Sequence, residues 1–89
     1  VYPNPVNLSR DYEIYFAGLP PKAEVRIMTI QGRTLRVLEE FDGNGGVEWD
    51  GRDRDGNTLE SGIYLFEVKE IRDDGSEIVS SLKKFAVQR

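Results

Sequence analysis

The side chains best suited to chemistry stand together in one acidic stretch. Three aspartates lie within residues 50–57, which read Asp-Gly-Arg-Asp-Arg-Asp-Gly-Asn. A calcium loop needs oxygen ligands at alternate positions before a Gly and a Glu six residues after that Gly. Here the first ligand position falls on Gly51 and the last on Gly62, so both key ligands are missing. We interpret the stretch as Asp-Gly turns with Asp/Arg pairs in solvent, and calcium binding stays open.

Nucleophilic and acid–base catalysis lack their usual groups. The chain contains no His and no Cys, which excludes a His-based triad, a thiol nucleophile, a disulfide and a Cys/His zinc site. Ser61 lies outside any Gly-x-Ser-x-Gly elbow and has no His to activate it. A carboxylate pair that hydrolyses glycosides needs a deep cleft, for which a chain of 89 residues has little room. We therefore predict a protein that is not an enzyme and needs no cofactor.

Trp49 is the single tryptophan, and it supports two interpretations. Exposed beside Tyr12 or Tyr15, its ring could stack on a sugar, as in a carbohydrate-binding module. In a small sandwich, however, a lone Trp is more often the largest side chain of the core. We favour the core position.

Composition narrows the class of protein further. The chain has 12 Lys and Arg against 16 Asp and Glu, a net charge of −4, which disfavours nucleic-acid binding. Its 38% apolar and 31% charged residues are typical of one small folded domain. No apolar run approaches the roughly 18 residues that a transmembrane segment needs.

The elements that would position these residues are strands. Apolar and polar residues alternate over short runs, and no helical period with caps extends over 12 or more residues. Turns rich in Gly, Asp, Asn and Pro separate the runs at intervals of about 8–12 residues. About seven strands arranged in this way predict an all-β, antiparallel β-sandwich. The alternating runs are 11–16, 24–27, 34–37, 47–49, 64–69 and 84–88.

The predicted core is small but sufficient for a domain without disulfides, as in fibronectin III-like sandwiches. It consists of apolar side chains on one face of each run and in the adjoining turns. These are Val6, Leu8, Ile14, Phe16, Leu19, Val25, Ile27, Ile30, Leu35, Leu38, Trp49, Leu59, Tyr64, Phe66, Val68, Leu82, Phe85 and Val87.

The two ends of the chain suggest its context. It starts at Val1 without Met and shows no signal-peptide pattern, so we expect residues 1–89 to be a single domain of a larger protein; that it is the C-terminal domain is what the family resemblance described below implies. The last run is basic in an acidic chain. Its Lys side chains could point outward from an edge strand and prevent aggregation. Alternatively, the run could be a partner-binding strand, with Lys83, Lys84, Phe85 and Arg89 as its candidate contacts.

An ordered series of short motifs covers nearly the whole chain and resembles a known family. The resemblance is to the immunoglobulin-like domain of flagellar hook-cap proteins (the FlgD-like type) and to the C-terminal sorting domains, or Por secretion tails, of type IX secretion cargo. The motifs are 2–5 (Tyr-Pro-Asn-Pro), 19–20 (Leu-Pro), 31–33 (Gln-Gly-Arg), 49–53 (Trp-Asp-Gly-Arg-Asp), 56–57 (Gly-Asn), 61–64 (Ser-Gly-Ile-Tyr) and 84–87 (Lys-Phe-Ala-Val).

The resemblance implies an immunoglobulin-like, fibronectin III-like fold and a sorting or anchoring role. Such a domain directs a secreted cargo through the periplasm and across the outer membrane to the cell surface or medium. Its partners would be proteins, namely the secretion or assembly machinery or the cargo domain upstream. The alternative within the same family is a structural spacer or assembly module of hook-cap type. The acidic hairpin 70–77 is a departure, because many compact sorting tails shorten it.

The positions that the resemblance carries over also have physical interpretations. Pro3 and Pro5, on either side of Asn4, would hold the entry segment extended. Gly62 would allow a tight bend or a close backbone approach, and Tyr64 would bury its ring while its hydroxyl bonds to the backbone. The last carried-over position is Lys84, and a partner would recognise its strand by edge addition.

Overall fold

The computed structural model describes residues 6–8, 14–40, 43 and 45–89, and Pro3, Asn4 and Pro5 lie outside these ranges. The described residues form an all-β, immunoglobulin-like fold, which confirms the predicted class. The strands are β1 (Val6–Asn7), β2 (Ile14–Ala17), β3 (Ala23–Met28), β4 (Thr34–Glu40), β5 (Gly46–Trp49), β6 (Gly62–Ile71), β7 (Glu77–Val79) and β8 (Lys83–Gln88).

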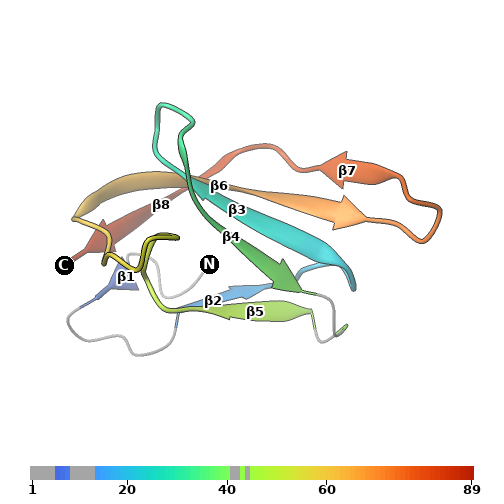
Figure 1. Ribbon diagram of the computed structural model, residues 1–89, viewed down its shortest axis with the longest axis horizontal. Coiled ribbons are helices and arrows are strands. Elements are labelled where there is room, and N and C mark those ends of the chain that lie inside the picture. The colour runs from blue at the N-terminus through green and yellow to red at the C-terminus, as the bar shows by residue number, and fades with distance from the viewer. Residues whose placement is uncertain (1–5, 9–13, 41–42, 44) are drawn as a thin grey trace.

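Two sheets of unequal size make up the sandwich (Figure 1). The larger has the order β1-β8-β6-β3-β4, with β7 also paired to β6, and the smaller consists of β2 and β5. All pairs are antiparallel except that of β1 with β8, where Val6 lies opposite Val87. The predicted antiparallel sandwich therefore includes one parallel pair. Parallel strands need a long connection, and here most of the chain lies between them.

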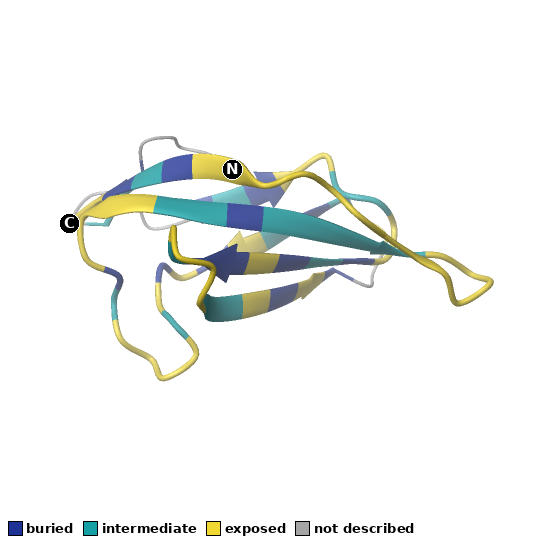
Figure 2. Cartoon of the chain, turned by 90° about the horizontal axis from the view of Figure 1, so that it is seen from above, coloured by how far each residue is buried: buried dark blue, intermediate teal, exposed yellow. Residues whose placement is uncertain are grey.

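Strand register places the apolar residues on one inner face. Val25 of β3 lies between Leu38 of β4 and Val68 of β6, and Ile27 lies opposite Phe66. The small sheet lies across this face, so buried and exposed positions alternate along the strands (Figure 2). The result is one core between two sheets.

Most of the predicted core is confirmed. Leu8, Leu19, Leu35, Tyr64 and Val68 are only partly buried, but they pack against the core. Two predictions are wrong: Ile30 is 60% exposed in the turn after β3, and Leu82 is 55% exposed where the chain passes from β7 to β8. The buried members are Val6, Ile14, Phe16, Val25, Ile27, Leu38, Trp49, Leu59, Phe66, Phe85 and Val87, together with Ala23 and Met28, which the sequence interpretation missed.

A break after β7 lets two short strands share one side of the ten-residue strand β6. Ser80 bridges this break. The backbone N–H of Val68 donates to Ser80 Oγ at 2.9 Å, and the backbone N–H of Ser80 donates to the Val68 carbonyl at 2.8 Å. The side chain thus replaces a ladder bond, because an amide left unpaired inside a sheet costs stability.

The fold requires glycine at Gly51 rather than at Gly62. Gly51 has φ +77°, and a Cβ there would lie 2.6 Å from Leu8 Cδ2 and 3.3 Å from Ile14 Cδ1. Gly62 does not have a positive φ, and a Cβ would meet the Tyr64 ring at an ordinary 3.9 Å. The physical interpretation of Gly62 as a tight bend or close approach is therefore wrong.

Substituting the two glycines separates these roles. We expect Gly51→Ala to lower the free energy of unfolding by about 1–3 kcal/mol, because both the backbone and the new methyl group would be strained. Gly62→Ala should change it by less than about 0.5 kcal/mol, as for an exposed position without special geometry. Urea denaturation of both variants measures this difference. Equal losses would contradict the steric argument.

Candidate functional site

The basic C-terminal strand does not present its residues as one surface. Phe85 is 2% exposed, and its ring lies edge-on to Trp49 and Phe66 with centroid distances of 5.9 Å to each. Phe85 is therefore a core residue, and its prediction as a partner contact is wrong. Inward-facing residues alternate along a strand that forms one wall of a sandwich, and Phe85 occupies such a position.

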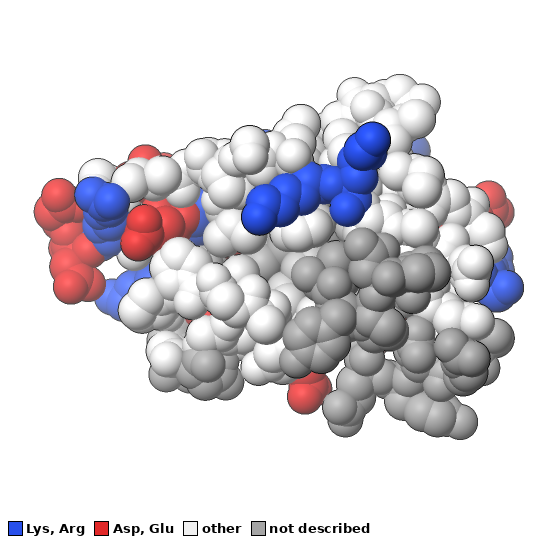
Figure 3. Space-filling view, turned by 180° about the vertical axis from the view of Figure 1, so that it is seen from behind, with Lys and Arg blue, Asp and Glu red and all other residues white. Residues whose placement is uncertain are grey.

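Lys83 and Lys84 point to opposite sides of the large sheet. Lys83 lies opposite the inward residue Phe66, whereas Lys84 lies opposite Leu65. Both lysines are exposed. Viewed from behind, some basic side chains lie near the middle of the molecule, and the end where acidic side chains gather carries basic ones as well (Figure 3).

The edge of β8 is already occupied near its end. β8 pairs with β6 on one side and, at Val87 and Gln88, with β1 on the other. The interpretation of this run as an edge strand is therefore wrong over these two residues, and a partner cannot add a strand there without displacing β1. Beyond β8, the Arg89 backbone N–H donates to Ser61 Oγ at 2.9 Å, which ties the chain end to the turn before β6.

Tyr64 makes the backbone bond predicted for it. Its hydroxyl donates to the carbonyl oxygen of Glu60 at 2.8 Å, and its ring packs 6.0 Å from the Phe85 ring. Partial burial, with the nearby charge of Glu60, raises the pKa of Tyr64 above its ordinary value. The bond closes the turn that leads into β6, so Tyr64 has a clear structural role.

The Tyr64 bond predicts a pH-dependent contribution to stability. The pKa of Tyr64 is 10.0 in the unfolded reference and higher in the folded protein. The contribution of the Tyr64 hydroxyl to the free energy of unfolding is therefore complete below about pH 10, and it is lost as the pH rises through the pKa of the folded state. We expect Tyr64→Phe to cost about 0.5–1.5 kcal/mol at neutral pH. The difference from wild type should shrink in alkali. Unfolding free energies of both proteins against pH measure it, and a constant difference would contradict this account.

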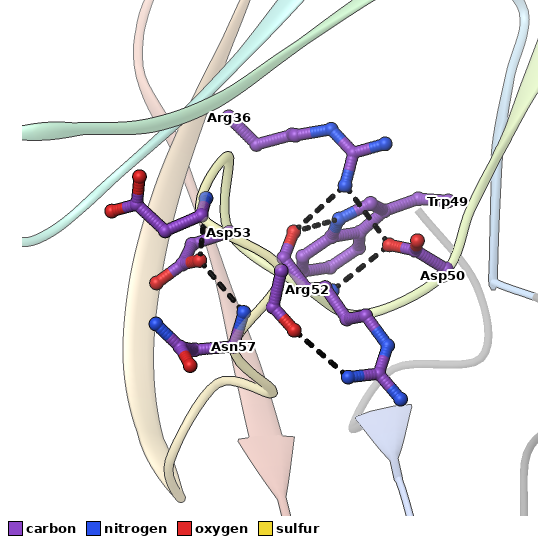
Figure 4. Close-up of polar contacts among 8 residues, drawn as sticks. Arg36, Trp49, Asp50, Arg52, Asp53 and Asn57 are labelled. Atoms are coloured by element: carbon purple, nitrogen blue, oxygen red, sulfur yellow. Dashed lines mark hydrogen bonds and ion pairs between the residues drawn. The ribbon is translucent and has the colours of Figure 1, made fainter.

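Trp49 connects the core to the Asp-rich loop. It is 3% exposed, which confirms its core position, and its indole Nε1–H donates to the Arg52 carbonyl at 3.0 Å. Arg36 of β4 donates to the same carbonyl at 3.1 Å and to Asp50 Oδ1 at 3.0 Å (Figure 4). Sequence patterns did not identify Arg36, because 14 residues separate it from Asp50. The buried indole offers no platform for a sugar.

The rest of the Asp-rich loop, residues 52–58, is a set of turns, as the sequence interpretation predicted. Asp53 Oδ1 accepts from the backbone N–H groups of Asp55 at 2.9 Å and Asn57 at 3.0 Å. Arg52 donates to the Gly56 carbonyl at 2.9 Å and pairs with Thr58 in an isolated bridge. Within the described ranges, no cluster of three or more acidic side chains is arranged to hold a metal ion.

Asp53 and Asp55 form a matched pair for testing the loop. Asp53→Ala removes the acceptor for two backbone amides, and we expect a loss of about 1 kcal/mol in unfolding free energy. The Asp55 carboxylate makes no hydrogen bond or ion pair with other described residues, so Asp55→Ala should be nearly neutral. Thermal denaturation with and without calcium measures both effects. Equal losses, or a calcium-dependent rise in Tm that Asp55→Ala removes, would contradict the turn interpretation.

The outer face of the large sheet carries ion pairs across β3, β6 and β7. Arg26 pairs with Glu67, and Lys69 Nζ lies 3.2 Å from both Glu77 Oε2 and Glu24 Oε2. Hydrogen bonds to Glu77 and Glu24 raise the pKa of the Lys69 ammonium. These charges therefore support strand pairing across the sheet.

Most of the chain matches a known domain family. The model of the FlgD Ig-like domain matches residues 13–74, more than half of the chain. The chain belongs to this family. The matched residues include the core tryptophan, the Asp-rich loop and Tyr64, so the contacts of that loop and the Tyr64–Glu60 bond lie within the family's own segment. Strands β7 and β8 lie outside it. The family is that of an immunoglobulin-like domain, and no catalytic family is evident.

Solved structures give the same fold. A segment of PorZ from Porphyromonas gingivalis, described as an essential bacterial surface component of the type IX secretion system, matches with a TM-score of 0.73 and 32% identity. Dimeric latent PorU from the same organism matches with a TM-score of 0.73 and 22% identity, and FlgD from Pseudomonas aeruginosa with 0.63 and 20%. The two lower identities show the fold alone.

The extent of these matches differs. The chain is covered to 99% by PorZ and 98% by PorU, but it spans only 11% and 9% of those chains. For FlgD the shares are 93% of this chain and 64% of that one. A search of curated proteins finds no match. Among the described residues there is no helix long and apolar enough to cross a membrane.

Proposed function

We propose that residues 1–89 form a non-catalytic C-terminal sorting and anchoring domain of a larger protein. In this role the domain directs its cargo across the outer membrane through the type IX secretion system, and the cargo becomes secreted or surface-bound. Its partners are proteins of the secretion machinery. The observation that carries the proposal is the 32% identity, over 99% of this chain, to part of a surface component of that system.

The arrangement of the site is consistent with a domain that acts through its surface. Trp49, Tyr64 and Phe85 are engaged in packing or backbone bonds, so the motif residues with large side chains hold the fold. The exposed basic residues of β8 remain available for recognition. Fold alone does not define a function, and the proposal therefore needs an export experiment.

The export experiment joins residues 1–89 to the C-terminus of a fluorescent reporter with a signal peptide. The fusion is produced in a bacterium that has a type IX system, and surface reporter is measured by its accessibility to external protease. We expect the reporter to reach the surface or medium. In a strain without the type IX translocon it should stay in the periplasm. Equal export without the domain, or without the translocon, would overturn the proposal.

Charge variants then test the recognition strand without removing core residues. Lys84→Gln should reduce surface reporter several-fold if this side chain contacts the machinery. Arg33→Gln is the matched control, because Arg33 is an exposed cation in the turn between β3 and β4. Both variants should unfold at the wild-type urea concentration. If the two variants are exported equally well, Lys84 does not contact the secretion machinery.

The second candidate function is that of a structural spacer or assembly module. It is favoured by the family match and by the resemblance to FlgD over 93% of this chain. A spacer would leave the reporter in the periplasm even when the translocon is present, so the export experiment separates the two functions. The carbohydrate-binding alternative loses its main residue, since Trp49 is buried.

A further inference from the structure

The unequal sizes of the two sheets leave an open groove on the inner face of the larger one. The groove has a volume of about 330 Å³ and lies over the middle of β6. Three inward residues of β6 form its floor, namely Phe66, Val68 and Glu70. Residues 16–20, at the end of β2, border it, as do residues of β7, of β8 and of the break between them.

Most of the groove is apolar surface. Phe16 and Phe66 contribute buried rings, and Leu19 and Val68 are only partly buried. Ile78 is on the inner side of the large sheet, opposite Glu70, but it is 44% exposed because the small sheet does not reach it. Concave apolar surfaces of roughly 300–1,000 Å³ with a few polar groups are the usual sites for small ligands.

The backbone groups around the groove are already bonded. The N–H of Val68 donates to Ser80 Oγ, and its carbonyl accepts from the N–H of Ser80. The N–H of Leu19 donates to the Gly45 carbonyl at 2.9 Å, and Pro20 has no N–H. A peptide in the groove would leave its own backbone groups without partners, which costs stability. An alkyl chain has no such groups, so these contacts favour an alkyl ligand.

The charges at the groove favour an anionic head group. Glu70 and Lys83 both line it. Arg72 Nε lies 3.6 Å from Glu70 Oε2, so the carboxylate is already paired. No ion pair joins Lys83 to another described residue. The uncompensated charge at the groove is therefore positive, although the chain as a whole has a net charge of −4.

We propose that the groove binds one unbranched alkyl chain with a carboxylate head group, as in a fatty acid. The alkyl chain lies over Phe66 and Val68 and contacts Ile78, and the carboxylate pairs with the Lys83 ammonium. Burial of CH₂ groups supplies most of the affinity, and the ion pair orients the ligand. This inference does not depend on the secretion role, since a spacer module would have the same groove.

A series of fatty acids tests the apolar contribution. The probes are hexanoate, octanoate and decanoate, titrated into the whole chain by calorimetry at concentrations below micelle formation. We expect the Kd to fall about two- to fourfold for each added CH₂, because burying one CH₂ contributes up to about 0.8 kcal/mol. Slower amide hydrogen exchange at Val68 and Ser80 should accompany binding, since the ligand covers both residues.

A pair of charge variants tests the head group. Octanol, which lacks the carboxylate, should bind about three- to fivefold more weakly than octanoate, the effect of one exposed ion pair. Lys83→Gln should weaken octanoate binding by the same factor and leave octanol binding unchanged. Arg33→Gln is the matched control, because it removes an exposed cation from the turn between β3 and β4. It should change neither Kd.

A pair of apolar variants locates the alkyl chain. Ile78→Asn removes an apolar contact of the groove, and we expect it to weaken octanoate and octanol alike, about three- to tenfold. Val79→Asn is the matched control, because Val79 is 52% exposed and lies opposite Lys69 on the outer face. It should leave both Kd values unchanged. All four variants should unfold at the wild-type urea concentration, so that weaker binding does not reflect unfolding.

Three results would overturn the inference. One is a titration without binding, or a Kd that does not fall with chain length. Another is a Kd that does not distinguish Ile78→Asn from Val79→Asn, or Lys83→Gln from Arg33→Gln. The third is a stable dimer in sedimentation that is lost in Ile78→Asn, which would make a second copy the occupant. The readout is independent of export, so failed sorting with intact octanoate binding would overturn only the proposed function.

Discussion

The whole structure depends on a cluster of aromatic rings around Phe16, which joins the two sheets. Phe16 of β2 is 1% exposed, and its ring centroid lies 5.1 Å from Phe66, 6.2 Å from Trp49 and 6.3 Å from Phe85. The small sheet has only two strands, so this packing, rather than backbone bonding, holds it against the large sheet. Through Trp49, the same packing positions the Asp-rich loop that follows β5.

The Asp-rich loop shows how this core organises the surface. Trp49 ends β5 with its ring in the core, and its indole N–H reaches forward to Arg52. Arg36 joins the loop to β4 through Asp50. The conspicuous Trp-Asp-Gly-Arg-Asp motif thus maintains the fold. The motif therefore does not by itself assign a function, which depends on residues elsewhere on the surface.

Much of the fold follows from local patterns. The alternation in β6 correctly predicted that Tyr64, Phe66 and Val68 face inward, because side-chain direction in a strand has a period of two. The same rule could not place Ile30 or Leu82. Both are apolar residues outside strands, where alternation carries no information and exposure depends on what the neighbouring elements cover.

The sequence by itself determined the strand-forming segments, most of the core, the turn character of the Asp-rich loop and the family. Only the tertiary structure decided that Lys83 and Lys84 face opposite sides, that Phe85 is buried and that Arg36 meets Asp50. It also decided that β1 lies parallel to β8 and that the small sheet stops short of Ile78. The reason is physical: propensity and alternation act between near neighbours, whereas sheet pairing and coverage depend on burial between residues far apart in the chain.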